Sequence, residues 1–333
     1  MKNTIRKFRT ILLQPSASKA SPLGGGWRGL LFLCFALGTS HFARAQQDPL
    51  YTQYMFNIQL VNPAYVGTWD GIGVTALTRN QWLGVDKAPT TNTLSFQAPM
   101  KNDNMAFGAS VMDDRFGNIN RLAVYADYSY MLQLNDRGTK LRLGLKAGFS
   151  NYFNDLGAHK VQDVDDPAFQ GLIEQSFMPN FGFGVFLYDD LYYFGASIPK
   201  MIEHNVENDT NKDWNIQSDL RHWTFMGGYV FTLTDEFKFK PSTAVRMVAG
   251  APLNVDFNAN FLIKEKFWFG GMYRLDAGFG ANLQFIIDEK LRVGYSIDFS
   301  NKGIYANSMG VHELMVSYEL NVTKNIYRSP RYY

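Results

Sequence analysis

The pair His312-Glu313 begins like the metal-binding helix of zinc proteases. In that helix two histidines lie four residues apart on one face, and the glutamate beside the first acts as the general base. No second histidine follows His312 at this spacing, and the residues around it alternate between apolar and polar as in a strand. On a strand, residues four apart do not share a ligand face as they do on a helix. We therefore interpret His312 as a core or rim histidine.

An acidic loop that begins at Asp209 resembles a calcium-binding loop, because acidic or amide residues occupy alternate positions. Such a loop needs a glycine at its sharp turn and a glutamate at its twelfth position. Trp214 and Leu220 stand at these positions, so we interpret the segment as a solvated acidic loop. Weak calcium binding is the alternative for this loop and for a second acidic group, formed by Asp163, Asp165 and Asp166.

Hydrolytic or acyl-transfer chemistry would need a nucleophile, a base and an orienting carboxylate close together. No serine lies in a nucleophile-elbow string, and the glycine-rich strings at Gly182 and Gly278 lack the strand-to-helix setting of a nucleotide-binding loop. The histidines that could act as a base after residue 45 are His159, His204, His222 and His312. The sequence therefore predicts no catalytic residue, no cofactor and no bound metal ion.

The elements that would carry these residues are strands. Apolar and polar residues alternate over about ten positions in residues 141–150, 254–264, 291–300 and 313–322. Ordinary strands have about five or six residues, whereas a tilted strand needs about ten to cross a bilayer. The apolar faces are rich in Phe and Tyr, as in a lipid-facing band with aromatic girdles. A soluble β-sandwich also alternates but fits the length and the aromatic faces less well.

The alternation predicts an all-β fold, a transmembrane antiparallel β-barrel of about 14 strands. Links after the even-numbered strands are short and polar, and those after the odd-numbered strands include the long ones, at 151–180 and 199–221. Outer-membrane barrels have short periplasmic turns and longer extracellular loops, and an even strand number returns both ends to the periplasm. The predicted strands are 71–82, 91–100, 104–112, 121–134, 140–150, 181–188, 191–198, 222–233, 237–249, 254–264, 266–274, 276–287, 290–300 and 311–322.

The first 45 residues predict a signal peptide. They carry 7 basic and no acidic residues, then an apolar run at 30–37, and small residues at Ala43 and Ala45. We expect cleavage after Ala45, because the run is too short to span a bilayer. Cleavage leaves 25 Lys and Arg against 30 Asp and Glu, a formal charge of −5, with no cysteine and no basic arm for nucleic acid. The predicted parts are a signal peptide at 1–45, a periplasmic or lumenal N-terminal segment at 46–70, the barrel at 71–322 and a periplasmic tail at 323–333.

Four strings of the chain resemble the PorP/SprF family of outer-membrane proteins, which is associated with the type IX secretion system of the Bacteroidota. They are "DPLYTQYMFNIQLVNPAYVGT", "RNQWLGVDKAPTTNTLSFQAP", "GVHELMVSYEL" and "SPRYY". The most specific positions are Asn62, Pro63, Ala64, Tyr65, Gly67, Arg79, Gln81, Trp82, Ser329, Pro330 and Arg331, and Tyr333 stands where the family usually has Phe.

The resemblance implies an outer-membrane accessory barrel without catalysis. Its partners would be outer-membrane lipid, periplasmic or outer-membrane components of the secretion system, and a secreted cargo protein. The alternative function is a passive pore or hydrophobic-solute channel, because a barrel of this size can enclose a lumen.

The N-terminal segment combines a fixed turn at Asn62-Pro63 with several aromatic residues. We expect either a lumenal or rim plug, or a partner-docking segment that is loose in the free protein. The tail joins arginine and tyrosine side chains, which are common in binding hot spots, although frayed termini are the usual alternative. The sequence predicts a periplasmic docking face formed or supported by Asn62, Pro63, Tyr65, Arg328, Pro330 and Arg331.

Overall fold

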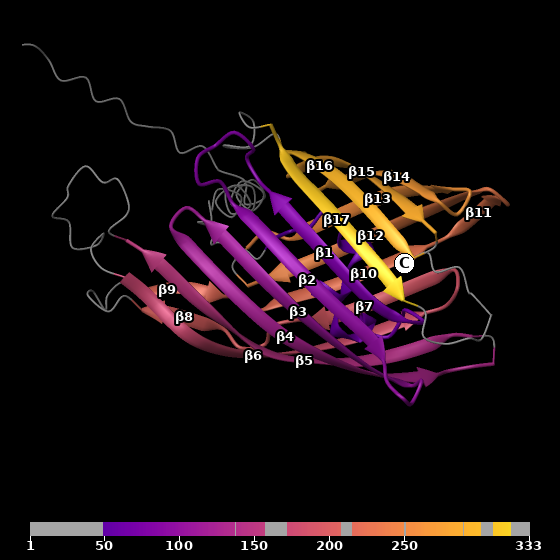
Figure 1. The fold of residues 1–333 in the computed structure, drawn as a ribbon, viewed down its shortest axis with the longest axis horizontal. Helices are drawn as coiled ribbons and strands as arrows, with labels where there is room; N and C mark the ends of the chain where they lie inside the picture. The colour runs from indigo at the N-terminus through magenta and orange to yellow at the C-terminus, as the bar shows by residue number, and fades with distance from the viewer. Residues whose placement is uncertain are drawn as a thin grey trace, which may run out of the picture. The chain divides into compact units, whose positions relative to one another are not determined.

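The computed structural model describes residues 49–136, 138–156, 172–207, 215–249, 251–288, 290–300 and 309–320. The predicted signal peptide and tail lie outside these residues. Within them the main sheet is closed (Figure 1), and β10 and β11 occupy the place of one interrupted strand in it. The strands of this sheet are β1 (Ile72–Asn80), β2 (Thr90–Pro99), β3 (Met105–Phe116), β4 (Ile119–Gln133), β5 (Lys140–Asp155), β6 (Leu172–Tyr188), β7 (Tyr192–Ile198), β10 (His222–Tyr229), β11 (Phe231–Thr234), β12 (Phe237–Val248), β13 (Asn254–Ile263), β14 (Phe267–Arg274), β15 (Gly278–Ile287), β16 (Leu291–Ser300) and β17 (Val311–Leu320).

The sheet is an antiparallel β-barrel of 14 strands, which confirms the predicted fold. Neighbours in sequence pair with each other, β10 pairs with both β7 and β12, and the seam is closed by β1 against β17. Figure 1 shows these two strands side by side. Among the described residues, no helix is long and apolar enough to cross a membrane.

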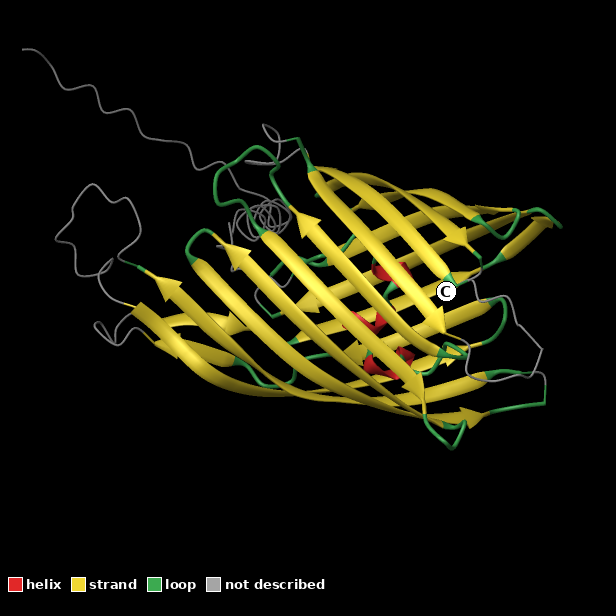
Figure 2. Ribbon diagram, viewed as in Figure 1, coloured by secondary structure: helices red, strands yellow, loops and turns green. Residues whose placement is uncertain are grey.

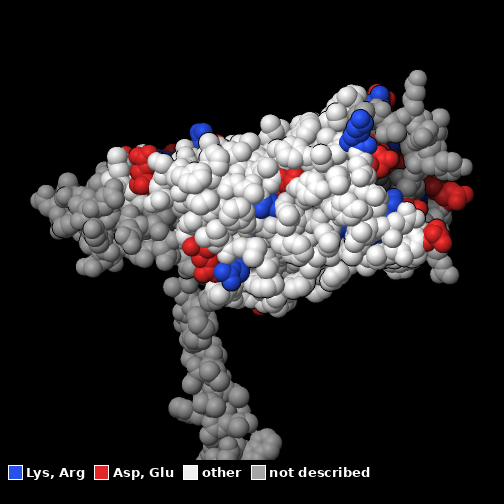
Figure 3. Space-filling model, turned by 90° about the horizontal axis from the view of Figure 1, so that it is seen from below, with Lys and Arg blue, Asp and Glu red and all other residues white. Residues whose placement is uncertain are grey.

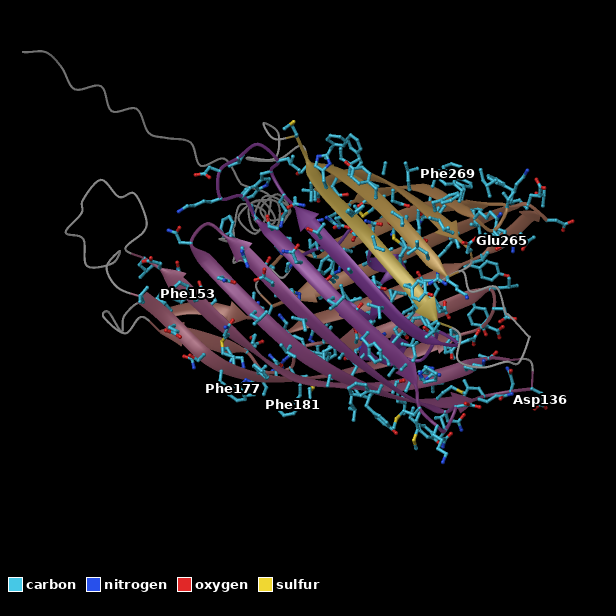
Figure 4. The ribbon with its side chains drawn as sticks, viewed as in Figure 1. Asp136, Phe153, Phe177, Phe181, Glu265 and Phe269 are labelled. Carbon is cyan, nitrogen blue, oxygen red and sulfur yellow. The ribbon has the colours of Figure 1, made fainter. Side chains whose placement is uncertain are left out.

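The two ends of the barrel differ in their connections. Short links follow β2, β4, β6, β11, β13 and β15, at the end where β1 starts and β17 finishes. We call this the short-turn end and the opposite one the long-loop end. In Figure 4 the labelled Asp136 and Glu265 mark the short-turn end, while Phe153 lies toward the long-loop end. The predicted difference between the two sets of links is therefore present.

The polarity of the two strand faces is the reverse of that in a soluble protein, with apolar side chains outside and polar ones inside. On β5, Leu145 is 57% exposed on the outer face, while Arg142 and Lys146 face inward and are only 4% exposed. Phe177 and Phe181 on β6 project outward in the same way (Figure 4). The face in Figure 3 is largely uncharged, with its charged residues mostly toward the two ends. An apolar outside and a polar inside suit a barrel in lipid.

Stacked phenylalanine rings form part of the outer face near the short-turn end. The ring centroids of Phe231 and Phe239 are 6.2 Å apart, those of Phe239 and Phe261 4.9 Å, and those of Phe261 and Phe269 5.3 Å. Each ring comes from a neighbouring strand of the series β11 to β14. Such a row is typical of the aromatic girdle at a membrane interface.

Two predicted loops contain more strand than expected. β5 and β6 continue together into the range 151–180, and a separate two-stranded sheet, β8 (His204–Glu207) with β9 (Asn215–Asp219), lies within 199–221. A register shift between Ser150 and Tyr152 interrupts the simple alternation at the start of the extension. The inner face of the extension then buries a small apolar cluster of Tyr152, Leu156, Ile173 and Met178 against Ile119.

The N-terminal segment, defined here as residues 49–70, lies inside the barrel. It forms three short 3₁₀ helices, η1 (Tyr54–Phe56), η2 (Ile58–Leu60) and η3 (Pro63–Tyr65), which Figure 2 shows in red between the strands. Met55, Ile58 and Ala64 are fully buried. They belong to the main apolar cluster, whose other members include inward-facing residues of β1, β6, β7 and β17. The hydrophobic core is therefore built around this segment.

Candidate functional site

The candidate site is the filled lumen, and its first part is a charged network at the long-loop end. The backbone N–H groups of Thr52 and Gln53 donate to the two carboxylate oxygens of Glu313, at 2.8 and 2.9 Å. The Arg79 guanidinium of β1 donates to the same carboxylate at 2.5 Å. Thr52 also donates its hydroxyl proton to Asp298 of β16. These groups are almost fully buried, so the network ties the segment to both sides of the barrel seam.

A second charged group lies on the wall formed by β12 to β14. Asp256 binds Arg246 at 3.2 Å and Arg274 at 2.7 Å. The Arg246 guanidinium lies 5.1 Å from the ring centroid of Tyr54. The Tyr54 hydroxyl accepts a hydrogen bond from Asn258 at 2.7 Å. Helix η1 is thus held by one cation and one amide, and the buried carboxylate keeps the cation in place.

A third polar contact crosses the middle of the lumen. The Gln59 amide donates to Asp127 of β4 at 3.1 Å and to the backbone carbonyl of Phe96 at 3.0 Å. Asp127 also pairs with Lys146 of β5 at 3.2 Å, and both side chains are buried. Burying a charge costs much free energy unless the charge is paired and hydrogen-bonded. The glutamine therefore joins an ion pair that the barrel itself supplies.

Helix η3 packs its backbone closely against the wall at β5 and β6. Asn62 caps it, since its side-chain oxygen accepts from the Ala64 N–H at 2.9 Å, while its amide donates to the Val185 carbonyl at 3.0 Å. Pro63 occupies the first turn, where its missing N–H costs nothing. A Cβ atom built on Gly144 would lie 2.2 Å from the Ala64 nitrogen. Only glycine fits at that position of β5.

Lys240 of β12 lies among three aromatic rings, one from the segment and two from the wall. The Lys240 ammonium lies 5.4 to 5.9 Å from the ring centroids of Phe56, Tyr193 and Trp268. Its nitrogen is buried and has no hydrogen-bond partner among the described residues. Asn260 and Asn282, also inward-facing, have side-chain amide atoms without such a partner in the same part of the chain. Cation–π attraction is the contact that holds this ammonium.

The lumen carries more buried cations than anions. The buried charged side chains of the described residues are Arg79, Arg121, Arg142, Lys146, Lys200, Lys240, Arg246 and Arg274, against Asp127, Asp256, Asp298, Glu313 and Glu319. A cavity of about 80 Å³ remains beside the segment, and its lining includes Tyr51, Lys200, His222 and Arg246. A space of this size holds a few water molecules.

The predicted docking residues fall into two groups. Asn62, Pro63 and Tyr65 come together in η3 and are buried in the lumen. In this conformation they can support a partner-binding face but cannot form its contact surface. Arg328, Pro330, Arg331 and the predicted cleavage position Ala45 lie outside the described residues.

Sequence reasoning missed the charged side chains that hold the segment. Arg79 was singled out only through the family resemblance, and Glu313 only as part of a zinc-like string. Both stand on the inward face of strands that cross the membrane. A charge in a membrane-spanning strand is costly unless it is partnered, and this signal could have identified them.

His204 and His312, two of the predicted histidines that the structure describes, make separate contacts. His204 contacts the Pro179 carbonyl at 2.8 Å, and His312 contacts the Tyr295 hydroxyl at 2.5 Å and the Met309 carbonyl at 3.1 Å. Within the described ranges, no group of three or more His, Cys, Asp or Glu is arranged to hold a metal ion. His159, the acidic group at Asp163, Asp165 and Asp166, and residues 209–214 of the other acidic loop lie outside the described residues.

Comparison with known proteins gives one family. A family model described as "Type IX secretion system membrane protein PorP/SprF" matches residues 43–318. No curated protein matches the chain.

Several solved structures are similar at low sequence identity. The outer membrane protein Omp33 of Acinetobacter baumannii is 11% identical, with a TM-score of 0.45, over 76% of this chain and 100% of that one. The toluene transporter TodX of Pseudomonas putida is 11% identical, with a TM-score of 0.47, over 80% and 93%. A FadL homologue of Pseudomonas aeruginosa is 12% identical, with a TM-score of 0.43, over 82% and 95%.

Proposed function

Because the chain belongs to the PorP/SprF family of type IX secretion system membrane proteins, we propose that it is an accessory barrel of this system in the outer membrane. It helps a secreted cargo protein to reach the cell surface or to stay attached there, and it couples that cargo to the periplasmic machinery. The family and the barrel fold indicate a component of secretion or transport. We assign it no catalytic residue.

The observation that supports a scaffold over a conduit is the filled lumen. A passive pore, the alternative, needs a continuous aqueous path between the two ends. Here the segment is pinned to β17 by Glu313, to β4 by Asp127 and to β6 by the Val185 carbonyl. Its side chains replace the water that would otherwise fill a barrel of this strand number. The lumen therefore binds the chain's own N-terminal segment, which favours a scaffold over an open pore.

Conductance across a planar bilayer tests this proposal. The unaltered protein is expected to be nearly silent. Gly144→Ala places a methyl group against the Ala64 backbone, and such overpacking costs about 1–3 kcal/mol. The segment should therefore be displaced part of the time and produce stepwise openings. These openings should favour anions, because the lumen has an excess of buried cations.

The matched control is Gly271→Ala. A Cβ atom at Gly271 would lie 3.7 Å from the Gly280 carbonyl oxygen, an ordinary van der Waals contact. This variant should stay as silent as the unaltered protein. Large steady currents from the unaltered protein would contradict the scaffold and support the pore.

The carboxyl-terminal residues 329–333 supply the docking part of the proposal. Leu320 ends β17 at the short-turn end, which supports a periplasmic tail because short turns are periplasmic in outer-membrane barrels. It contains Arg328 and Arg331 with three tyrosines and no acidic residue. We propose that it engages a periplasmic component, with the buried Asn62, Pro63 and Tyr65 supporting the wall nearby.

Deleting residues 329–333 is expected to leave the barrel inserted and heat-modifiable on a gel while abolishing cargo display at the cell surface. Immunodetection of cargo on intact cells measures display, and copurification from native outer membranes identifies the lost partner. Normal display by the truncated protein would disprove docking through the tail. Failure to insert would instead make the tail an assembly signal.

A further inference from the structure

The N-terminal segment enters the lumen at the long-loop end. Thr52 contacts Asp298, which lies two residues before β16 ends, and Glu313, which lies two residues after β17 starts. Tyr51 donates its hydroxyl proton to the Met112 sulfur, near the end of β3, at 3.7 Å. All three wall positions belong to strand ends that carry the connections of the long-loop end. The first described residues therefore lie at this mouth of the barrel.

The same segment leaves the lumen at the short-turn end. Trp69 lies against Gly73, the second residue of β1, and its ring centroid is 4.7 Å from the Arg292 guanidinium, on the second residue of β16. The Gly67 N–H donates to Gln97, two residues before β2 ends, at 2.9 Å. These positions are all close to the short turns. Between residues 52 and 69 the chain has crossed the full height of the wall.

This path changes the topology predicted from strand number. Fourteen strands place the start of β1 and the end of β17 at one end of the barrel. The segment adds one further pass through the lumen, so its own start lies at the opposite end. Counting strands therefore places the end of β17 correctly relative to the start of β1, but it does not place the start of the segment. The two ends of the described chain, residues 49 and 320, lie at opposite mouths.

We propose that the amino terminus of the mature chain is presented at the cell surface, through the long-loop mouth, while the carboxyl terminus stays in the periplasm. Tyr51 and Thr52 contact the wall at this mouth, and the described chain starts two residues earlier, at Pro49. The contacts of Thr52 and Gln53 with a buried carboxylate hold this direction. Under this proposal the two ends of the mature chain are on opposite sides of the outer membrane, and the amino-terminal one is accessible to proteins outside the cell. The inference depends on barrel orientation and not on the secretion role.

Single cysteines can test the proposal, because the only cysteine of the chain, Cys34, lies in the predicted signal peptide. A membrane-impermeant maleimide is applied to intact and to permeabilised cells. Three variants are compared: Gln47→Cys before the segment, Asp86→Cys in the exposed link between β1 and β2 at the long-loop end, and Glu265→Cys in the exposed turn after β13. Gln47→Cys and Asp86→Cys should give a labelling ratio between intact and permeabilised cells close to unity. Glu265→Cys should give a ratio close to zero.

The outcome that overturns the proposal is labelling of Gln47→Cys only after permeabilisation, together with Glu265→Cys. An inverted barrel is distinguishable, since Asp86→Cys and Glu265→Cys would then exchange their behaviour while Gln47→Cys still followed Asp86→Cys. A short epitope inserted between Gln47 and Asp48 provides a second readout with an antibody on intact cells. If neither cysteine nor epitope is detected under any native condition, the terminus is enclosed in the lumen and the proposal is wrong.

Discussion

Replacing Glu313 by alanine is expected to lower the free energy of unfolding of the barrel by about 3–5 kcal/mol, the usual cost of removing one partner of a buried ion pair. The Arg79 guanidinium would stay buried with its nearest anion removed. The N–H groups of Thr52 and Gln53 would lose their acceptors at the same time. Denaturant unfolding of the protein in phospholipid vesicles, followed by tryptophan fluorescence, measures the change.

Two variants serve as controls for this result. Glu313→Gln keeps the shape and one acceptor, so it should fall between the alanine variant and the unaltered protein. Arg115→Ala breaks a pair with Asp113 in which the arginine side chain is 64% exposed, and exposed pairs contribute about 0–1 kcal/mol. If Glu313→Ala were as mild as Arg115→Ala, the carboxylate would not be buried in the lumen as described.

Replacing Phe257 by arginine is expected to cost about 2–4 kcal/mol, the range for a cation on the lipid face near the bilayer midplane. Phe257 is 52% exposed on the outer face of β13. Its ring faces lipid, where an arginine must either lose hydration or draw water and headgroups inward. The same unfolding measurement detects the loss, and insertion into vesicles should slow.

The control for the lipid face is Asp136→Arg, in the exposed turn after β4 at the short-turn end (Figure 4). It should be nearly neutral. Equal losses at Phe257 and Asp136 would argue that no lipid contacts β13. The neighbouring Asn258 is a poor control, because the filled lumen packs it against Tyr54 and an arginine there would overpack by about 1–3 kcal/mol.

The strands could be predicted from the sequence because each face of a membrane strand has one environment. Lipid selects apolar side chains on the outer face, and the lumen selects small or polar ones, so the two-residue period is strong. Residues 290–300 predicted a strand and β16 spans Leu291–Ser300. Turns with two or three polar residues, such as Asp189 and Asp190 after β6, interrupt this period. They therefore marked the strand boundaries well.

The extension of β5 and β6 could not be predicted in this way. The register shift near Ser150 breaks the alternation, and the apolar cluster at Tyr152 and Ile173 faces inward rather than toward lipid. The lumenal contacts were equally hidden. Alternation indicates that Arg79, Asp127 and Glu313 face inward, but the partner of each depends on how the strands curve around the segment.

The bond between the Thr52 N–H and Glu313 joins residues 261 positions apart, and this separation constrains how the barrel assembles. Contacts between distant residues form late, because closing a long loop costs conformational entropy. The segment, with its 3₁₀ helices and with Gly144 against its backbone, is too bulky to thread through a finished barrel. The wall must therefore close around it. The segment therefore stays beside the incomplete sheet until β17 is in place. Only then can β1 and β17 pair and close the barrel.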